Sequence, residues 1–178
     1  MFKMIVAHTK DRGIGFRGGL PWRLKDDMLR FKRLTIGDNN NAVVMGKNTW
    51  LSLSKRPLQK RDNLILSKSI SFDYKKHWCK DLDHNNVKVF PEIIDLKKYC
   101  RERGYDDIWI IGGENIYTQF MKDPELKYIY TTEIDHIPFT HCDAYFPDIP
   151  SWFKRYWTSK KVLNKNTSYL YSVFSRPI

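Results

Sequence analysis

The stretch Ile108-Trp109-Ile110-Ile111-Gly112-Gly113-Glu114-Asn115-Ile116-Tyr117 predicts the class of the fold. Its first four residues are all apolar, without alternation, which is typical of a strand that is buried on both faces of a sheet. Two glycines end this strand, and the pattern from Asn115 to Met121 indicates a helix. A buried strand that leads through glycine into a helix is typical of α/β domains with a parallel sheet.

Short segments with a strand pattern alternate with segments with a helix pattern along the rest of the chain. The expected strands are Met4–Ala7, Ala42–Gly46, Asn63–Ser67, Val87–Phe90, Asp107–Ile111 and Tyr128–Ile134. The expected helices are Leu24–Leu34, Lys47–Leu53, Leu96–Arg103 and Asn115–Met121. Tyr156–Leu163 and Ser168–Phe174, joined by Asn164–Thr167, have the pattern of a hairpin. The sequence predicts an α/β fold with a mostly parallel central sheet, an antiparallel C-terminal edge and about four flanking helices.

The chain has 178 residues, of which 42% are hydrophobic and 15% are aromatic. This fits one compact domain with a full core, so we expect residues 1–178 to form a single domain. No apolar run approaches the roughly 18–20 residues that cross a membrane. The apolar stretch Met1–Ala7 is too short for a signal peptide. The prediction is a soluble, cytoplasmic protein.

Cysteine and histidine spacing indicates neither disulfides nor a metal site. Cys79, Cys100 and Cys142 are odd in number, lie far apart and form no CxxC pair. The five histidines show no HxxxH or HExxH spacing. The formal net charge of +11 is compatible with nucleic-acid binding or with attraction of small polyanions. Because the basic residues are dispersed, nucleic acid is not favoured as the main partner, and small anionic ligands fit at least as well.

Asp27 lies inside an apolar helical stripe. In a helix that starts after Pro21, the spacing i, i+3, i+4, i+7 brings Asp27 onto the same face as Leu24, Met28, Phe31 and Leu34. The neighbouring Asp26 projects elsewhere and can pair with Arg30. A lone carboxylate on a buried face is costly unless a partner satisfies it. We therefore expect Asp27 to meet a ligand that carries hydrogen-bond donors.

The segment Gly13-Ile14-Gly15-Phe16-Arg17-Gly18 matches the GxGxxG pattern of dinucleotide-binding loops. A Rossmann loop leads straight into a helix, whereas Gly19-Leu20-Pro21-Trp22 follows here. The segment is therefore interpreted as a mobile lid beside a site.

Two strand–glycine–helix junctions, Val44–Trp50 and Ile110–Tyr117, favour a phosphate-bearing ligand, because a helix N-terminus offers free N–H groups and the positive end of a dipole. Both junctions lie at carboxyl ends of strands, where ligands of α/β sheets bind, so a dinucleotide is favoured. Ser67 and Lys68 suit a ribose 2′-phosphate and hence NADP over NAD. The basic loop Arg56–Arg61 offers an arginine for a carboxylate.

Taken in order, these segments closely resemble dihydrofolate reductase. The matching segments are Asp11–Gly15, Leu20–Trp22, Asp27 with Phe31-Lys32, Val44–Gly46 with Thr49-Trp50, Arg56–Leu58, Arg61–Asn63, Leu66-Ser67, Ile111–Gly113, Tyr117, Thr132–Asp135 and Phe146–Asp148. They follow the family's order and spacing over nearly the whole chain. The resemblance implies a single domain with an eight-stranded mixed sheet and a cis peptide between Gly112 and Gly113.

The resemblance also implies the reaction and the ligands. NADPH would give a hydride to C6 of dihydrofolate, with protonation of N5, in tetrahydrofolate synthesis for one-carbon metabolism, which makes the protein an antifolate target. By this match Asp27 binds the pterin 2-amino group and N3, and burial raises the pKa of Asp27. The prediction is a cytoplasmic monomer that contains no metal.

Residue roles carry over from the resemblance onto matching positions. The implied catalytic residues are Asp27, Trp22, Leu20, Tyr117 and Thr132. The implied substrate-binding residues are Ile5, Val6, Ala7, Asp27, Met28, Phe31, Leu53, Leu58, Arg61, Ile111 and Thr132. The implied cofactor-binding residues are Ala7, Ile14, Gly15, Gly18, Gly19, Leu20, Gly46, Lys47, Asn48, Thr49, Leu66, Ser67, Lys68, Ile111, Gly112, Gly113, Glu114, Asn115, Ile116, Tyr117 and Gln119. Glu114, an acid beside the expected pyrophosphate, departs from the usual pattern, and the preference for NADPH depends mainly on Lys68 and Lys47.

Two alternatives remain at this point. A related reductase of the same fold would act on a riboflavin-pathway aminopyrimidine that carries a ribityl phosphate, although Arg61 and the Asp27 helix favour folate. A nucleic-acid-binding module would use the basic surface, and dispersed charges would then give weak, salt-sensitive binding.

Overall fold

The computed structural model describes residues 1–69, 85–135 and 141–177, so Cys79 lies outside the described residues. Its helices are α1 (Lys25–Ile36), α2 (Lys47–Ser52), α3 (Ile93–Arg103) and α4 (Glu114–Met121). Its strands are β1 (Phe2–Thr9), β2 (Gly13–Gly15), β3 (Ala42–Gly46), β4 (Asp62–Leu66), β5 (Val87–Phe90), β6 (Ile108–Ile110), β7 (Leu126–Ile134), β8 (Ala144–Tyr145), β9 (Lys154–Thr158), β10 (Val162–Asn164) and β11 (Thr167–Ser175).

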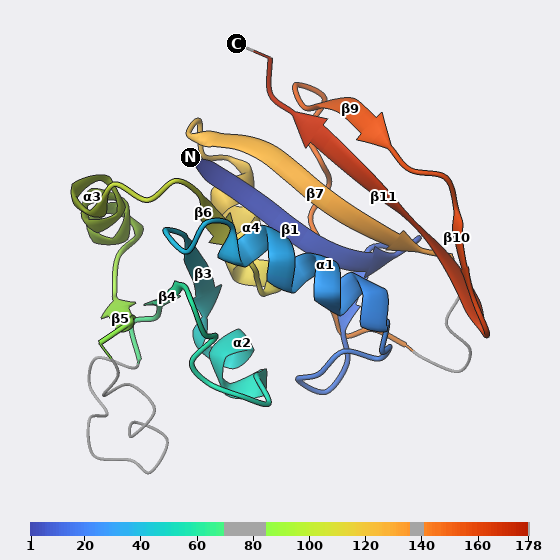
Figure 1. The fold of residues 1–178 in the computed structure, drawn as a ribbon, viewed down its shortest axis with the longest axis horizontal. Helices are drawn as coiled ribbons and strands as arrows, with labels where there is room; N and C mark the ends of the chain where they lie inside the picture. Colours follow the sequence, from blue (N-terminus) through green and yellow to red (C-terminus); the bar gives the residue numbers. More distant parts are fainter. Residues whose placement is uncertain (70–84, 136–140, 178) are drawn as a thin grey trace.

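One large sheet forms the centre of the molecule (Figure 1). Its strand order is β10-β11-β7-β1-β6-β3-β4-β5, and β9 also pairs with β11, beside β10 on the same edge. The strands from β7 to β5 are parallel, whereas β11 runs antiparallel to β7, β9 and β10. The sheet is therefore eight strands wide, mixed and mostly parallel, as the sequence and the resemblance predicted.

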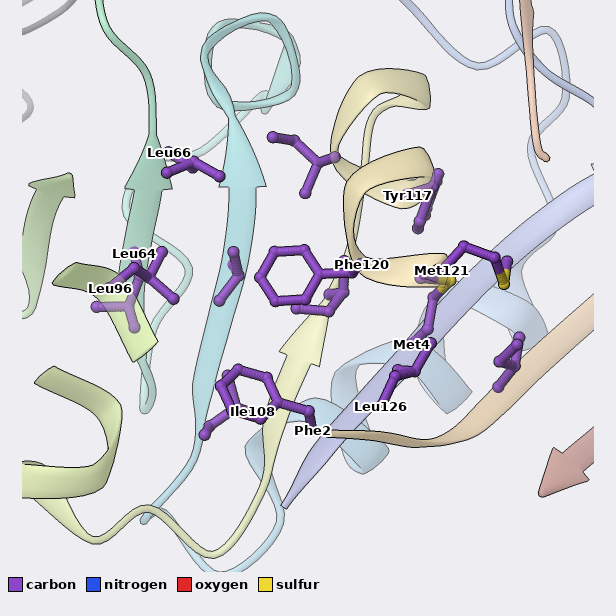
Figure 2. Packing of buried hydrophobic residues seen from close by; sticks show 14 of the residues in the cluster. Phe2, Met4, Leu64, Leu66, Leu96, Ile108, Tyr117, Phe120, Met121 and Leu126 are labelled. Atoms are coloured by element: carbon purple, nitrogen blue, oxygen red, sulfur yellow. The ribbon is translucent and has the colours of Figure 1, made fainter. Parts of the chain in front are cut away.

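Alternate residues of the central strands pack on opposite faces of the sheet, which explains why these strands are apolar throughout. Met4, Val44 and Ile110 belong to the core on the side of α3 and α4, and Figure 2 shows Phe120 of α4 within this cluster. Ile5, Val43, Met45 and Trp109 belong to the core that packs with Phe31 and Leu34 of α1 and with Trp50 of α2. Helices thus cover both faces of the parallel part.

Several predicted boundaries differ from the structure. The hairpin strand predicted over Tyr156–Leu163 is two strands, β9 and β10, because the chain leaves the edge of β11 between Thr158 and Val162. Helix α3 begins at Ile93, three residues before the predicted start. It ends at Arg103, and the φ of 64° at Gly104 and the bond from its N–H to the Cys100 carbonyl confirm Gly104 as the predicted C-cap.

The sequence did not predict a second, two-stranded sheet that pairs β2 with β8. Two- and three-residue strands carry too few residues for a recognisable alternation. In the described residues, no helix is long and apolar enough to span a membrane.

Candidate active site

Asp27 lies where helix α1 crosses the face of the sheet near β7. The Thr132 hydroxyl of β7 donates a hydrogen bond of 2.6 Å to Oδ1 of Asp27. Burial raises the pKa of Asp27 above its ordinary value, and the bond from Thr132 and the charge of Arg30 oppose this effect. The structure thus brings together Asp27 and Thr132, which are 105 residues apart in the sequence.

The stripe that the sequence assigned to α1 is only partly buried. Leu24 is 4% exposed, whereas Met28 is 55% exposed. Asp26 is exposed, and no ion pair joins it to Arg30 in the part of the chain that the structure describes. The Arg30 guanidinium carbon lies 4.2 Å from the centroid of the Tyr171 ring and acts electrostatically on Asp27. Arg30 thus belongs to the side of the helix that faces the sheet.

Hydrogen bonds connect β1 and β3 to the residues that follow β6. The hydroxyl of the buried Tyr117 donates 2.8 Å to the Ile5 carbonyl, and the Ile111 N–H donates 2.9 Å to the Val44 carbonyl. Ala7 is the register partner of Thr132 and packs near Trp22. These contacts join the ends of β1, β3, β6 and β7.

Strand alternation divides the predicted pterin-pocket residues of β1. Ile5 belongs to the core on the α1 side, whereas Val6 belongs to the core on the α3 and α4 side. A direct side-chain contact with a ligand beside Asp27 is therefore open to Ile5, but Val6 can offer only its backbone.

The apolar residues predicted for the substrate channel gather between α1 and the segment after α2. Phe31, Leu53 and Leu58 all pack, partly buried, against the core that contains Trp50. Arg61 lies next to this group, since its guanidinium carbon is 6.0 Å from the centroid of the Phe31 ring. This arrangement suits an aromatic ring more than a polar chain.

Arg61 is a buried cation without an acidic partner among the described residues. It is 7% exposed; its Nε donates 2.9 Å to the Gln59 carbonyl and its Nη1 donates 2.5 Å to the Thr35 hydroxyl. Its guanidinium carbon lies 6.0 Å from the centroid of the Phe31 ring. Burial lowers the pKa of Arg61, although a guanidinium stays protonated in proteins. Such a group favours an anionic ligand.

The two strand–glycine–helix junctions lie side by side. The Gly46 N–H donates 2.9 Å to the Gly112 carbonyl. A Cβ atom on Gly46 would lie 3.1 Å from Cγ1 of Ile116, and one on Gly113 would lie 3.4 Å from the Thr49 hydroxyl. Helix α4 begins after Gly113 without a side-chain cap, so its first N–H groups face the junction.

Gly112 has a φ of 113°, and a Cβ atom there would lie 3.0 Å from the Tyr117 ring. The peptide between Gly112 and Gly113 is cis, as the resemblance implied, and so is the one between Arg56 and Pro57.

We expect Gly112→Ala to lower the free energy of unfolding by about 1–3 kcal/mol from backbone strain, with an added cost from displacing Tyr117. Urea denaturation measures this change. The matched control is Gly104→Ala, because Gly104 also has a positive φ, 64°, but no atom within 4 Å of its Cβ position. Equal losses in the two variants would contradict close packing between Gly112 and Tyr117.

The glycine-rich segment is held at both of its ends. The Asp143 N–H donates 2.9 Å to the Gly15 carbonyl, and the Arg17 N–H donates 2.9 Å to Oδ2 of Asp143. Phe16 and Gly19 exchange backbone bonds of 3.0 Å, while Leu20 is 62% exposed. Sequence reasoning missed Asp143, since Asp143 and Arg17 are 126 residues apart and no local pattern joins them.

Glu114 also has a structural partner in this region. Its Oε2 accepts a hydrogen bond of 3.2 Å from the Tyr145 N–H of β8. The acid that departs from the family pattern thus connects the start of α4 to the small sheet. This contact gives Glu114 a structural role that does not depend on a bound phosphate.

Basic and hydroxyl side chains gather after β4. Lys47 Nζ donates 3.3 Å to the Ser69 hydroxyl, which lies 3.3 Å from the Ser67 hydroxyl. Lys68 forms an ion pair of 3.0 Å with Glu92. Sequence reasoning identified Lys47, Ser67 and Lys68 but missed Ser69, which follows them directly, and Glu92, which reaches Lys68 through the pairing of β4 with β5.

The remaining predicted cofactor residues lie around these elements. Asn48 and Asn115 are exposed, and Gln119 Nε2 donates 2.6 Å to Oδ1 of Asn115. Leu66 is buried, 8% exposed, at the end of β4. In the part of the chain that the structure describes, no cluster of three metal-ligating side chains occurs.

Comparison with known proteins agrees with this geometry. The family model for dihydrofolate reductase matches residues 1–176. Dihydrofolate reductase of Drosophila melanogaster is 36% identical over 160 residues, which cover 86% of this chain and 82% of that protein. Dihydrofolate reductase of Heliothis virescens is 36% identical over 153 residues, covering 82% and 78% of the two chains.

A longer relative covers nearly the whole chain. Bifunctional dihydrofolate reductase-thymidylate synthase of Zea mays is 31% identical over 188 residues, which cover 98% of this chain and 34% of that protein. The match of a family model to almost every residue, together with the fold, shows that the chain belongs to the dihydrofolate reductase family.

Proposed function

We propose that the site around Asp27 reduces dihydrofolate with NADPH as the hydride donor. The reaction class follows from the family: the chain is an oxidoreductase that converts dihydrofolate to tetrahydrofolate. The observation that carries the assignment of the site is a half-buried carboxyl group with a raised pKa, bonded to Thr132 of β7, the strand that pairs with β1.

Asp27 is the proposed contact for the pterin ring. A carboxylate can accept two parallel hydrogen bonds, and the pterin 2-amino group and N3 offer two adjacent donors. Thr132 occupies Oδ1 from the sheet side and so fixes the plane of the carboxyl group. Ile5, Ile111 and Phe31 would contact the ring faces.

The reduction consumes one proton and one hydride. When bound, NADPH supplies the hydride for C6 of dihydrofolate, and the proton goes to N5. Burial keeps the pKa of Asp27 raised, so this carboxyl group can carry or relay a proton closer to neutral pH than an exposed one could. Leu20 and Trp22 belong to the segment that would cover the reacting atoms and exclude water.

The benzoyl-glutamate tail of dihydrofolate would continue along Phe31, Leu53 and Leu58 to Arg61. The Arg61 side chain uses Nε and Nη1 for Gln59 and Thr35, and this side chain makes no further hydrogen bond among the described residues. Its Nη2 group is the proposed donor to the glutamate α-carboxylate. Met28, exposed on α1, would line the opposite side of the tail.

The residues at the glycine junctions fit a dinucleotide. Side chains at Gly46 and Gly113 would fill the space beside Ile116 and Thr49, so glycine keeps the backbone accessible there. Uncapped N–H groups of α4 face the same junction. The proposed cofactor-binding residues from the lid and from the junctions are Ile14, Gly15, Gly18, Gly19, Gly46, Lys47, Asn48, Thr49, Gly112, Gly113, Asn115 and Gln119.

Lys68→Ala is expected to lower the preference for NADPH over NADH by up to about fivefold, since one exposed charge contact contributes up to about 1 kcal/mol. Glu92→Gln should raise the same preference, because Glu92 both pairs with Lys68 and would repel a 2′-phosphate. The ratio of kcat/KM for the two cofactors measures both effects. A preference unchanged by either substitution would place the 2′-phosphate elsewhere.

The finer assignments of partner and compartment are also proposals. We propose that residues 1–178 act as one catalytic domain, as a monomer in the cytoplasm, with no nucleic acid as main partner. Cys100 and Cys142 are both unpaired cysteines, which fits a reducing compartment.

The experiment that tests the function is NADPH oxidation with dihydrofolate as substrate, repeated with NADH. A riboflavin-pathway aminopyrimidine serves as the competing substrate. Turnover of dihydrofolate alone supports the proposal, whereas turnover of the aminopyrimidine alone would contradict it.

A further inference from the structure

Arg30 is a cation that α1 carries towards the sheet. Its guanidinium carbon lies 4.2 Å from the centroid of the Tyr171 ring and 5.8 Å from that of the Tyr130 ring. A guanidinium within about 6 Å of an aromatic ring is attracted by it, and more strongly when both are withdrawn from water. The two tyrosines therefore hold the charge in one place.

The same two rings lie beside Thr132. Tyr130 precedes Thr132 by two positions on β7, so both side chains lie on one face of the sheet. Tyr171 of β11 is the register partner of Thr132. Asp27 and Arg30 are three residues apart on α1 and share a helix face. The hydrogen bond from Thr132 to Asp27 and the rings that hold Arg30 thus belong to one patch of the sheet.

Arg30 is the one charged group among the described residues that acts on Asp27. Burial raises the pKa of Asp27, while the charge of Arg30 lowers it. The tyrosines of β11 near Asp27, Tyr169 and Tyr171, have pKa values raised by burial, so both stay neutral while the carboxyl group titrates. Burial lowers the pKa of Arg30, but arginine stays protonated in proteins.

We propose that Arg30 is a positioning residue of this site: held by Tyr130 and Tyr171, it supplies a permanent positive charge beside Asp27 and so sets the pH range over which the site takes up the proton for reduction. The inference deepens the proposed function and rests on it. A fixed cation disfavours an added proton whether that proton goes to Asp27 or to N5 of the bound pterin. The sign of the effect is therefore the same for direct and for water-mediated delivery.

Arg30→Met tests the charge, because methionine keeps an apolar stem against the tyrosine rings. We expect the Asp27 carboxyl group, followed by ¹³C NMR in the ligand-free protein, to titrate about one pH unit higher than in the wild type. The fall of kcat/KM for dihydrofolate at high pH should move upward by a similar amount. Arg30→Lys, which restores the charge, should return both curves most of the way.

The tyrosine that holds Arg30 provides an independent test. Tyr171→Leu removes the ring and should reproduce part of the Arg30→Met shift, whereas Tyr171→Phe keeps the ring and should titrate like the wild type. The matched control is Arg33→Met, since Arg33 is exposed on the same helix and does not act on Asp27. That variant should leave both curves in place.

An unchanged Asp27 titration in Arg30→Met, with thermal unfolding showing an intact fold, would overturn the inference. Equal shifts in Arg30→Met and Arg33→Met would also overturn it, because they would indicate a general effect of net charge. The NMR titration needs no substrate and so separates the two proposals. Normal dihydrofolate turnover with no shift contradicts Arg30 alone, whereas absence of turnover contradicts the proposed function whatever the titration shows.

Discussion

Asp27→Asn is expected to lower kcat/KM for dihydrofolate at pH 7 by roughly 100- to 10,000-fold, the range over which a positioned acid–base group contributes. Asparagine has nearly the same size and can still accept the bond from Thr132. It cannot carry a proton, and its amide group would face the pterin donors with a donor of its own. Steady-state kinetics with NADPH measures the loss.

The control for this prediction is the neighbouring carboxylate. Asp26 is exposed, so Asp26→Asn should keep kcat/KM within about twofold, as surface substitutions away from a site generally do. Equal damage from both substitutions would contradict the separate roles of the two aspartates.

Asp27→Asn should lower activity but raise the free energy of unfolding, relative to the wild type, as the pH increases. Burial raises the pKa of Asp27 from its ordinary value of 3.8, so the folded protein binds this proton more tightly than the unfolded chain. The stabilisation from that proton is present at low pH and is lost as the pH rises through the folded-state pKa. Asparagine does not titrate, so its stability relative to the wild type should increase between pH 4 and pH 8, as urea denaturation at both pH values would show.

Arg61→Ala is expected to raise KM for dihydrofolate by roughly 30- to 5,000-fold, the range that corresponds to truncating one partner of a buried charge pair. Arg61 is 7% exposed and its guanidinium meets no acidic side chain among the described residues, so the carboxylate of a ligand would be its charge partner. A dihydropterin without the benzoyl-glutamate tail provides the comparison. Its KM should change little in Arg61→Ala.

Arg61 also stabilises the fold, which the sequence did not indicate. Its bonds to Thr35 and Gln59 join α1 to the loop before β4. Arg61→Ala is therefore expected to lower the free energy of unfolding as well, and Arg61→Lys should retain more of it. The matched control is Lys60→Asn, which removes an exposed charge next door while asparagine tolerates the φ of 64° at that position. Equal losses for both substrates in Arg61→Ala would indicate a structural role alone.

Local patterns determined much of the fold. Continuous apolar runs such as Ile108–Ile110 could pack only inside a sheet with helices on both faces, and the structure has that arrangement. Glycines at strand ends located the two strand–glycine–helix junctions. The apolar face of α1 located Asp27 on the side of the helix that faces the sheet. Each of these signals is carried by residues near one another in the chain, so the sequence displays it directly.

Long-range contacts were beyond local patterns. The β2–β8 pairing, the bonds of Asp143 to Gly15 and Arg17, and the contact of Glu114 with Tyr145 all join distant segments. The split of the C-terminal hairpin into β9 and β10 likewise depends on which residues of β11 each strand meets. These pairings depend on how the whole chain packs, and the residue pattern of one segment does not specify which other segment it contacts.

The same division holds at the site. By itself the sequence determined that Asp27 sits on the apolar side of a helix, because helical periodicity is a local property. Only the tertiary structure decided what surrounds that carboxyl group. Thr132 reaches the Asp27 carboxyl group because β7 pairs with β1. Arg30 contacts Tyr171 because β11 pairs with β7 and presents an aromatic side chain to the helix. The balance of burial, hydrogen bonding and charge that sets the pKa of Asp27 comes from those neighbours.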